Sequence, residues 1–105
     1  MPYVVDTIEV EPGQLAPYLD AVQRLGVPVM TDAGALFVSC ATTSAEIGEN
    51  VHVQVVWSFD DHDHWNLIRK NLVLDPRWYE YAARITALRR GGTRRFYYPV
   101  ALSTP

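Results

Sequence analysis

Asp6 is the residue of this chain whose setting most strongly suggests chemistry. It lies in a run, Tyr3–Val10, whose β-branched side chains predict a strand. Residues two apart on a strand share a face, so Asp6 shares its face with Val4 and other apolar side chains. A carboxylate in such a place must be paired or protonated, and it can transfer protons near neutral pH. We therefore expect either a general acid–base group or a salt bridge, for example to Arg69 or Arg95.

Two further polar residues, His52 and Gln54, share one face of a second predicted strand at residues 51–59. If the two strands are neighbours, Asp6 lies beside His52 or Gln54. An aspartate next to a histidine orients the imidazole for proton transfer. The alternative is that His52, which is near the end of its strand, is simply solvated.

Aromatic side chains recur in the second half of the chain at the spacing of helical faces. The aromatic residues are Trp65, Trp78 and Tyr81 on predicted helices and Trp57, Phe96, Tyr97 and Tyr98 on predicted strands. Arg69 lies on the same helical faces. Aromatic residues at this spacing usually form the core. Three tryptophans are nevertheless difficult to pack in so small a domain, and a flat apolar ligand would fill the gap. Arg69 could then bind a ligand oxygen on which negative charge develops.

Other chemical motifs are weaker. In residues 60–64 the histidines are two apart, so on a helix they cannot share a metal, and the acidic residues suit a helix start. We expect no metal site, although one histidine would suffice for haem as an alternative. The apolar neighbours of Cys40 predict that its thiol is buried and has a structural role. No glycine-rich nucleotide motif or nucleophile elbow is present.

The composition predicts one folded domain over residues 1–105, with a core at about 3–100 and a short tail at 103–105. The chain has 105 residues, of which 49% are hydrophobic and 20% charged. A net charge of −3 disfavours nucleic acid as a partner. The chain has one cluster of basic residues, which we interpret as marking a helix C-terminus and the following strand rather than an anion-binding site. The cluster consists of Arg84, Arg89, Arg90, Arg94 and Arg95. Without a signal peptide or membrane span, the expected location is the cytoplasm.

The apolar spacing predicts the element order β-α-β-β-α-β. Strands are expected at residues 3–10, 35–42, 51–59 and 93–100, and helices at 15–25, 61–74 and 76–88. The first helix is expected to end at Gly26, because Pro28 disfavours its continuation, and Gly91-Gly92 to end the last. This order is the ferredoxin-like α+β pattern, a four-stranded antiparallel sheet with both helical arms on one face. Because both strand faces are apolar, we expect the uncovered face to form a homodimer.

The second half of the chain resembles the NIPSNAP family. Residues 46–61 have its glycine turn, its apolar strand ending in Trp57-Ser58-Phe59 and its acidic helix start, and Asp75-Pro76-Arg77-Trp78 resembles its Asp-Pro-x-Trp. The resemblance covers about residues 3–100 and implies a dimeric α/β-barrel. The wider superfamily includes cofactor-free monooxygenases, lactone isomerases, polyketide cyclases and haem enzymes.

The chain also departs from the family pattern. Members often have an arginine where this chain has Asp6 and another where it has Trp65, while Arg69 keeps a second family arginine. The comparison implies a pocket that favours anions less and aromatic ligands more.

Together these features predict a small enzyme without a cofactor, acting on an aromatic or polyketide-like substrate in secondary metabolism. The reaction would be an isomerisation, cyclisation or monooxygenation driven by proton transfer. Asp6 would be the base, with His52, and Arg69 the stabiliser. The expected substrate-binding residues are Gln54, Trp65, Trp78, Tyr81 and Phe96. The alternatives are a non-catalytic dimeric module that binds a small ligand or haem, and a purely structural dimer.

Overall fold

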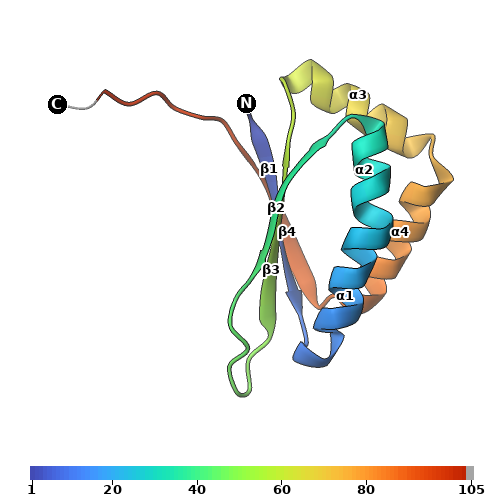
Figure 1. Cartoon of the computed structure of the whole chain (residues 1–105), viewed down its shortest axis with the longest axis vertical. Helices are drawn as coiled ribbons and strands as arrows, with labels where there is room; N and C mark the ends of the chain where they lie inside the picture. Colours follow the sequence, from blue (N-terminus) through green and yellow to red (C-terminus); the bar gives the residue numbers. More distant parts are fainter. Residues whose placement is uncertain (104–105) are drawn as a thin grey trace.

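The computed structural model describes residues 1–103 and has a four-stranded antiparallel sheet with its helices on one face (Figure 1). In chain order the elements are β1 (Tyr3–Val10), a 3₁₀ turn (Pro12–Gln14), α1 (Leu15–Ala21), a π-helical segment (Val22–Gly26), α2 (Val27–Ala33), β2 (Leu36–Thr42), β3 (Val51–Ser58), α3 (His62–Val73), α4 (Pro76–Leu88) and β4 (Gly91–Tyr97). The strand order is β2-β3-β1-β4. This arrangement confirms the predicted ferredoxin-like fold.

The two central strands, β1 and β3, supply most of the core. Val51, Val53, Val55 and Trp57 are all buried and alternate with more exposed residues, as a strand with one covered face requires. On β1, Val4 is fully buried in the same layer. The two strands pair antiparallel, as the sequence predicts, with Asp6 opposite Val55.

The first helical arm is longer than predicted. The chain does not stop at Gly26 but continues through the π-helical segment into α2. The Val27 N–H donates to the Val22 carbonyl, five residues back, and Pro28, which has no N–H to donate, follows directly at the start of α2. The arm ends instead at Gly34, whose φ of 115° suits glycine.

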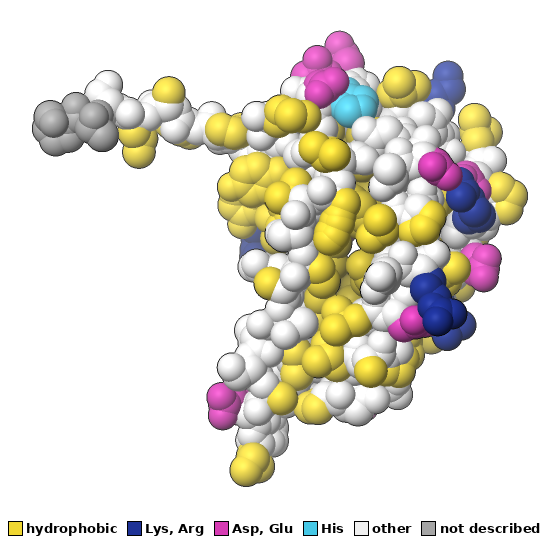
Figure 2. Space-filling view, in the orientation of Figure 1, with side chains coloured by type: hydrophobic (Ala, Val, Ile, Leu, Met, Phe, Trp, Pro, Cys, Tyr) yellow, Lys and Arg dark blue, Asp and Glu magenta, His cyan; other side chains and the backbone are white. Residues whose placement is uncertain are grey.

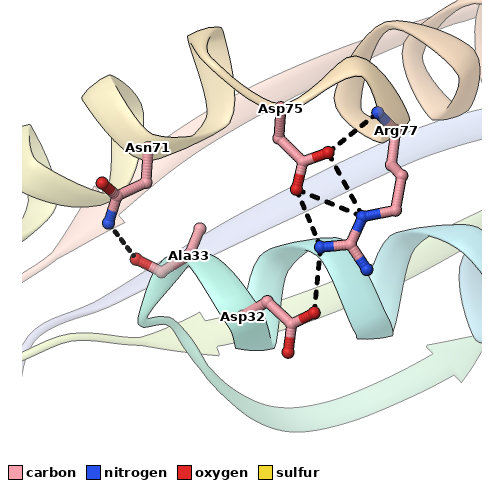
Figure 3. Close-up of polar contacts among 5 residues, drawn as sticks. All are labelled: Asp32, Ala33, Asn71, Asp75 and Arg77. Atoms are coloured by element: carbon pink, nitrogen blue, oxygen red, sulfur yellow. Dashed lines mark hydrogen bonds and ion pairs between the residues drawn. The ribbon is translucent and has the colours of Figure 1, made fainter.

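A polar cluster ties the two helical arms together (Figure 3). Arg77 donates to the carboxylate of Asp75 and, at 2.9 Å, to that of Asp32 on α2. The side-chain amide of Asn71 on α3 donates to the carbonyl of Ala33 at the end of α2. Asp75 also caps α4 by accepting the Arg77 backbone N–H. The corner between α3 and α4 is thus attached to α2.

No helix covers the second sheet face (Figure 1), which we call the open face. On it the rings of Tyr3 and Tyr97 stack with centroids 5.3 Å apart, and Leu36 is 58% exposed. β4 ends at Tyr97, earlier than predicted, and the following residues extend away from the domain (Figure 1). Of the predicted tail, residues 104–105 lie outside the described residues. Within residues 1–103, no helix has the length and apolar character needed to cross a membrane.

Two local predictions are wrong. Cys40 is exposed, because β2 forms an edge of the sheet where the cover is thin. The last strand, predicted to begin at Thr93, begins at Gly91, so both glycines belong to β4. A Cβ on Gly92 would lie 2.5 Å from Cδ1 of Ile8, so a larger residue at this strand start would force the side chain of Ile8 to shift.

A candidate acid–base site between sheet and helices

A cavity of about 320 Å³ lies between the covered face of the sheet and the helices. Figure 2 shows hydrophobic side chains gathered where the sheet and the helices meet. The cavity walls include Asp6, Tyr18, Trp57, Trp78, Tyr81 and Arg94. Its lining therefore combines flat aromatic surfaces with a few polar groups, which is typical of a small-molecule site.

Asp6 and Arg94 form a two-point ion pair in the wall of this cavity. Arg94 donates from Nε to Oδ1 at 2.6 Å and from Nη2 to Oδ2 at 2.9 Å. The two residues are direct partners between β1 and β4. The predicted salt bridge of Asp6 is therefore confirmed, but its partner is Arg94 rather than Arg69 or Arg95. Arg95, one residue later, points to the open face. Asp6 is a fixed carboxylate with a cationic neighbour.

Arg94 is held from its other side by an aromatic cluster. Its Cζ lies 5.6 Å from the ring centroid of Trp65, a cation–π contact. Trp65 packs with its centroid 5.3 Å from both Phe59 and Phe96. These rings line a separate hollow of about 170 Å³, together with Arg69. Trp65, Phe96 and Arg69 thus lie outside the lining of the Asp6 cavity.

Two phenols, Tyr18 and Tyr81, face the same cavity as Asp6. Burial raises the pKa of both phenols, and the negative charge of Asp6 raises the pKa further. Both groups therefore stay protonated at neutral pH and can donate a hydrogen bond to an anionic oxygen. Tyr81 and Trp78, both proposed from the sequence, are the two substrate-binding candidates that the structure places in this cavity.

Gly26 positions Tyr81, a role that the sequence reading missed. A Cβ on Gly26 would lie 2.7 Å from Cζ of Tyr81 and 2.9 Å from its hydroxyl oxygen. The phenol ring therefore lies directly against the backbone of the π-helical segment. Segments of this kind occur frequently at functional sites. A glycine inside an otherwise helical pattern was the available signal.

His52 and Gln54 lie on the open face, away from Asp6. Their partners on β1 are Glu9 and Thr7, whereas the partner of Asp6 is Val55. Adjacent strand residues point to opposite faces, so the imidazole of His52 cannot reach the carboxylate of Asp6. The predicted Asp6–His52 pair is wrong, and neither His52 nor Gln54 lines the cavity.

The acidic and histidine-rich run at residues 60–64 forms a helix start. Asp61 caps α3 by accepting the His64 backbone N–H at 2.8 Å, and Nδ1 of His64 accepts the Asp60 N–H at 2.8 Å. Within the described part of the chain, no three His, Cys, Asp or Glu residues are grouped to hold a metal.

The sequence matches the model of the NIPSNAP family over residues 3–104. This chain belongs to the NIPSNAP family. The match confirms the resemblance seen in the sequence. Comparison with curated protein sequences gave no match.

Solved structures of NIPSNAP proteins share this fold. A NIPSNAP domain protein from Burkholderia xenovorans is 25% identical, with a TM-score of 0.82 and 100% coverage of both chains. A NIPSNAP family protein of unknown function from Agrobacterium tumefaciens is 24% identical, with a TM-score of 0.77 over 98% of this chain and 91% of that chain. SnoaB, a cofactor-independent oxygenase from Streptomyces nogalater, is 17% identical, with a TM-score of 0.63 over 96% and 94%.

The Asp-Pro-x-Trp motif of this NIPSNAP chain connects the framework to the cavity. Asp75 caps α4, Pro76 occupies its first turn, and Arg77 attaches the corner to α2. Trp78, one residue further, lines the cavity and lies with its ring centroid 5.9 Å from that of Tyr81. The motif thus fixes the helix start that places an aromatic wall.

Proposed function

We propose that this chain is a small enzyme that acts, without a cofactor, on an aromatic or polyketide-like substrate by proton transfer. The observation that carries the proposal is the Asp6–Arg94 ion pair in a cavity lined by aromatic rings and protonated phenols. A carboxylate fixed beside a flat, apolar space is suited to remove a proton from an activated carbon. The cofactor-independent oxygenase SnoaB, which shares the fold, supports this class of reaction.

Each of these residues has a separate role in the proposed proton transfer. Asp6 takes the proton from a carbon next to a carbonyl group, which leaves negative charge on the carbonyl oxygen. Tyr18 and Tyr81 can donate hydrogen bonds to that oxygen. Arg94 holds the carboxylate in place through two hydrogen bonds. In this scheme the phenols take the stabilising role that the sequence suggested for Arg69, and Arg94 replaces His52 as the partner of Asp6.

Two outcomes of proton removal are chemically balanced. In an isomerase or cyclase, the protonated Asp6 returns the proton to another atom of the substrate. In a monooxygenase, the carbanion reacts with dioxygen, so that a CH₂ group becomes a carbonyl group, one oxygen atom enters the product and the other leaves as water.

Dithranol, a hydroxylated anthrone, provides a test because its CH₂ group is acidic and its oxidation to the quinone is visible by absorbance. We expect the protein to accelerate dioxygen consumption with dithranol, or hydrogen–deuterium exchange at its CH₂ group without oxygen. Asp6→Asn should lower the rate on the order of 100-fold. Gln54→Ala, on the open face, is the matched control and should keep the rate. A fully active Asp6→Asn variant would show that Asp6 is not the base.

We also propose that the open face joins a second copy of this chain. Apolar side chains on this face include Leu36 and the stacked Tyr3 and Tyr97. The face carries both an acid, Glu9, and a base, Arg95, so that a two-fold arrangement can bring opposite charges together. Exposed apolar residues also continue into the extended C-terminal segment, where Leu102 is 86% exposed.

Sedimentation at micromolar concentration tests this assembly, and a dimer is expected. Leu36→Glu should shift the protein toward monomer, because it places a charge in the interface. Leu74→Glu is the control, since Leu74 is 74% exposed at the end of α3, and should leave the dimer intact. A monomeric wild-type protein would refute the assignment.

A further inference from the structure

We propose that the substrate of this cavity carries an acidic group, a carboxylate or a phenolate, and that Arg89 binds it. This inference rests on the proposed function, because it assumes that the cavity holds an aromatic molecule. Beyond that function, the aromatic molecule is negatively charged, and Arg89 selects it by this charge.

The charged side chains that line the cavity carry one more positive charge than negative charge. They are Asp6, Arg89 and Arg94. Arg94 and Asp6 neutralise each other through two hydrogen bonds. Arg89 takes part in none of the ion pairs found among residues 1–103. One positive charge is therefore left for a ligand.

The backbone holds Arg89 at the open end of the cavity. Arg89 follows the last residue of α4, and its N–H still donates to the Ile85 carbonyl at 3.1 Å. The next residue, Arg90, is attached to β1 because its N–H donates to the Glu9 carbonyl at 2.8 Å and its side chain pairs with Glu11. The chain is thus fixed on both sides of Arg89, whose exposed side chain lies where the cavity meets solvent.

Other residues that line the cavity suit an anion attached to a flat ring. Trp78 and Tyr81 offer aromatic surfaces. A planar guanidinium matches the two oxygens of a carboxylate. The charge of Arg89 also acts within this space: burial and Asp6 raise the pKa of Tyr18, and Arg89 opposes that rise. A substrate anion beside Arg89 would replace the missing counter-charge.

A simpler role for Arg89 is to place a cation at the C-terminus of α4, where the helix dipole favours it. That role predicts no preference among ligands. The two possibilities therefore differ in a binding measurement, and Arg84 provides the comparison. Arg84 is exposed on the same helix and does not line the cavity.

The experiment compares naphthoate with naphthamide, two ligands of nearly the same shape of which only naphthoate is charged. Titration followed by tryptophan fluorescence should give about tenfold tighter binding of naphthoate at low salt, as expected for one charge-assisted contact. Arg89→Gln should remove this preference and leave naphthamide binding unchanged. Arg84→Gln makes the same change in net charge and should alter naphthoate binding less than twofold.

The outcomes separate the two proposals. Equal binding of both ligands by the wild-type protein overturns the role of Arg89 and leaves the aromatic cavity in place. An equal loss in Arg84→Gln and Arg89→Gln also overturns it, because net charge alone would then explain the preference. If neither ligand binds, the proposed function itself fails. Arg89→Lys, which keeps the charge, should retain a preference for naphthoate and guards against a folding defect in Arg89→Gln.

Discussion

Replacement of Arg94 by methionine should destabilise the domain, because it leaves the carboxylate of Asp6 without its cation. The side chain of Asp6 is only 17% exposed, so water cannot fully replace the lost partner. Arg94→Met keeps an unbranched aliphatic chain and removes the guanidinium group, which pairs with Asp6 and lies over the ring of Trp65. Combined with Asp6→Asn, it forms a double-mutant cycle that isolates the interaction between the two side chains.

The expected coupling follows from how the pair is placed. At a charge separation of about 4 Å and an effective dielectric constant of about 20, the Coulomb attraction is about 4 kcal/mol. Desolvation offsets part of this attraction. Exposed pairs retain about 0.2–1 kcal/mol, whereas breaking a fully buried pair costs about 3–5 kcal/mol. Since Arg94 is 40% exposed and Asp6 17%, we expect a coupling of about 2 kcal/mol.

Urea denaturation of the four proteins in the cycle measures this coupling. Asp20 and Arg24 provide a matched control, because they form an ion pair of similar length, 2.9 Å, with side chains 50% and 78% exposed. Their coupling should be about 0.3–0.5 kcal/mol and should fall with added salt, whereas that of Asp6 and Arg94 should fall less. A coupling at Asp6–Arg94 no larger than at Asp20–Arg24 would refute the view that the cavity wall holds a shielded ion pair.

Three further predictions follow from the same geometry. Gly26→Ala should lower the free energy of unfolding by about 1 kcal/mol in urea denaturation, since crowding of Tyr81 outweighs the gain in helix propensity. Because burial raises the pKa of Tyr18 and Tyr81 above 10.0, ultraviolet titration of the folded protein should show two phenols that are still protonated at pH 10.0, and Tyr18→Phe and Tyr81→Phe should each remove one of them. The stability linked to these two phenols is complete below pH 10.0 and is lost as the pH rises beyond it. Hydrogen bonds from Arg77 hold the pKa of Asp75 below 3.8, so the stability from this carboxylate is lost as the pH falls below that value, and Asp75→Asn should reduce the acid-induced loss seen by circular dichroism.

The sheet could be predicted from the sequence because its signal is local. The alternation of apolar residues in β3 gives the covered face directly, and β1 was predicted with its observed bounds. The interruption of the first helical arm was read wrongly because Gly26 and Pro28 are usually helix-ending residues. Here the π-helical hydrogen bond of Val27 moves the transition between helix types to that place, and no pattern of side chains reports such a bond.

The site was predicted in part. Asp6 was recognised from its apolar neighbours, but its partner depends on the register between β1 and β4, which is a long-range property. The alternation of side chains along a strand also indicates which arginine shares the covered face with Asp6. Phe96 was expected to bind substrate, and Arg94, two residues earlier, shares its face. The same rule would have separated His52 from Asp6, since both Val53 and Asp6 belong to covered faces.

The Asp6–Arg94 pair that equips the candidate site also helps to specify the fold. A shift of β4 by one residue along β1 would reverse the faces of β4 and turn Arg94 and Phe96 toward the open face. A shift of two would keep Asp6 on the covered face but place it opposite Gly92 or Phe96, neither of which offers a cation. Gly92 adds a steric constraint, because a Cβ at this position would lie 3.2 Å from the carbonyl oxygen of Thr7 and would force the side chain of Ile8 to shift. The observed register therefore pairs the carboxylate and also keeps Phe96 on the covered face against Trp65, so the chemistry of the cavity and the pairing of the strands depend on the same contacts.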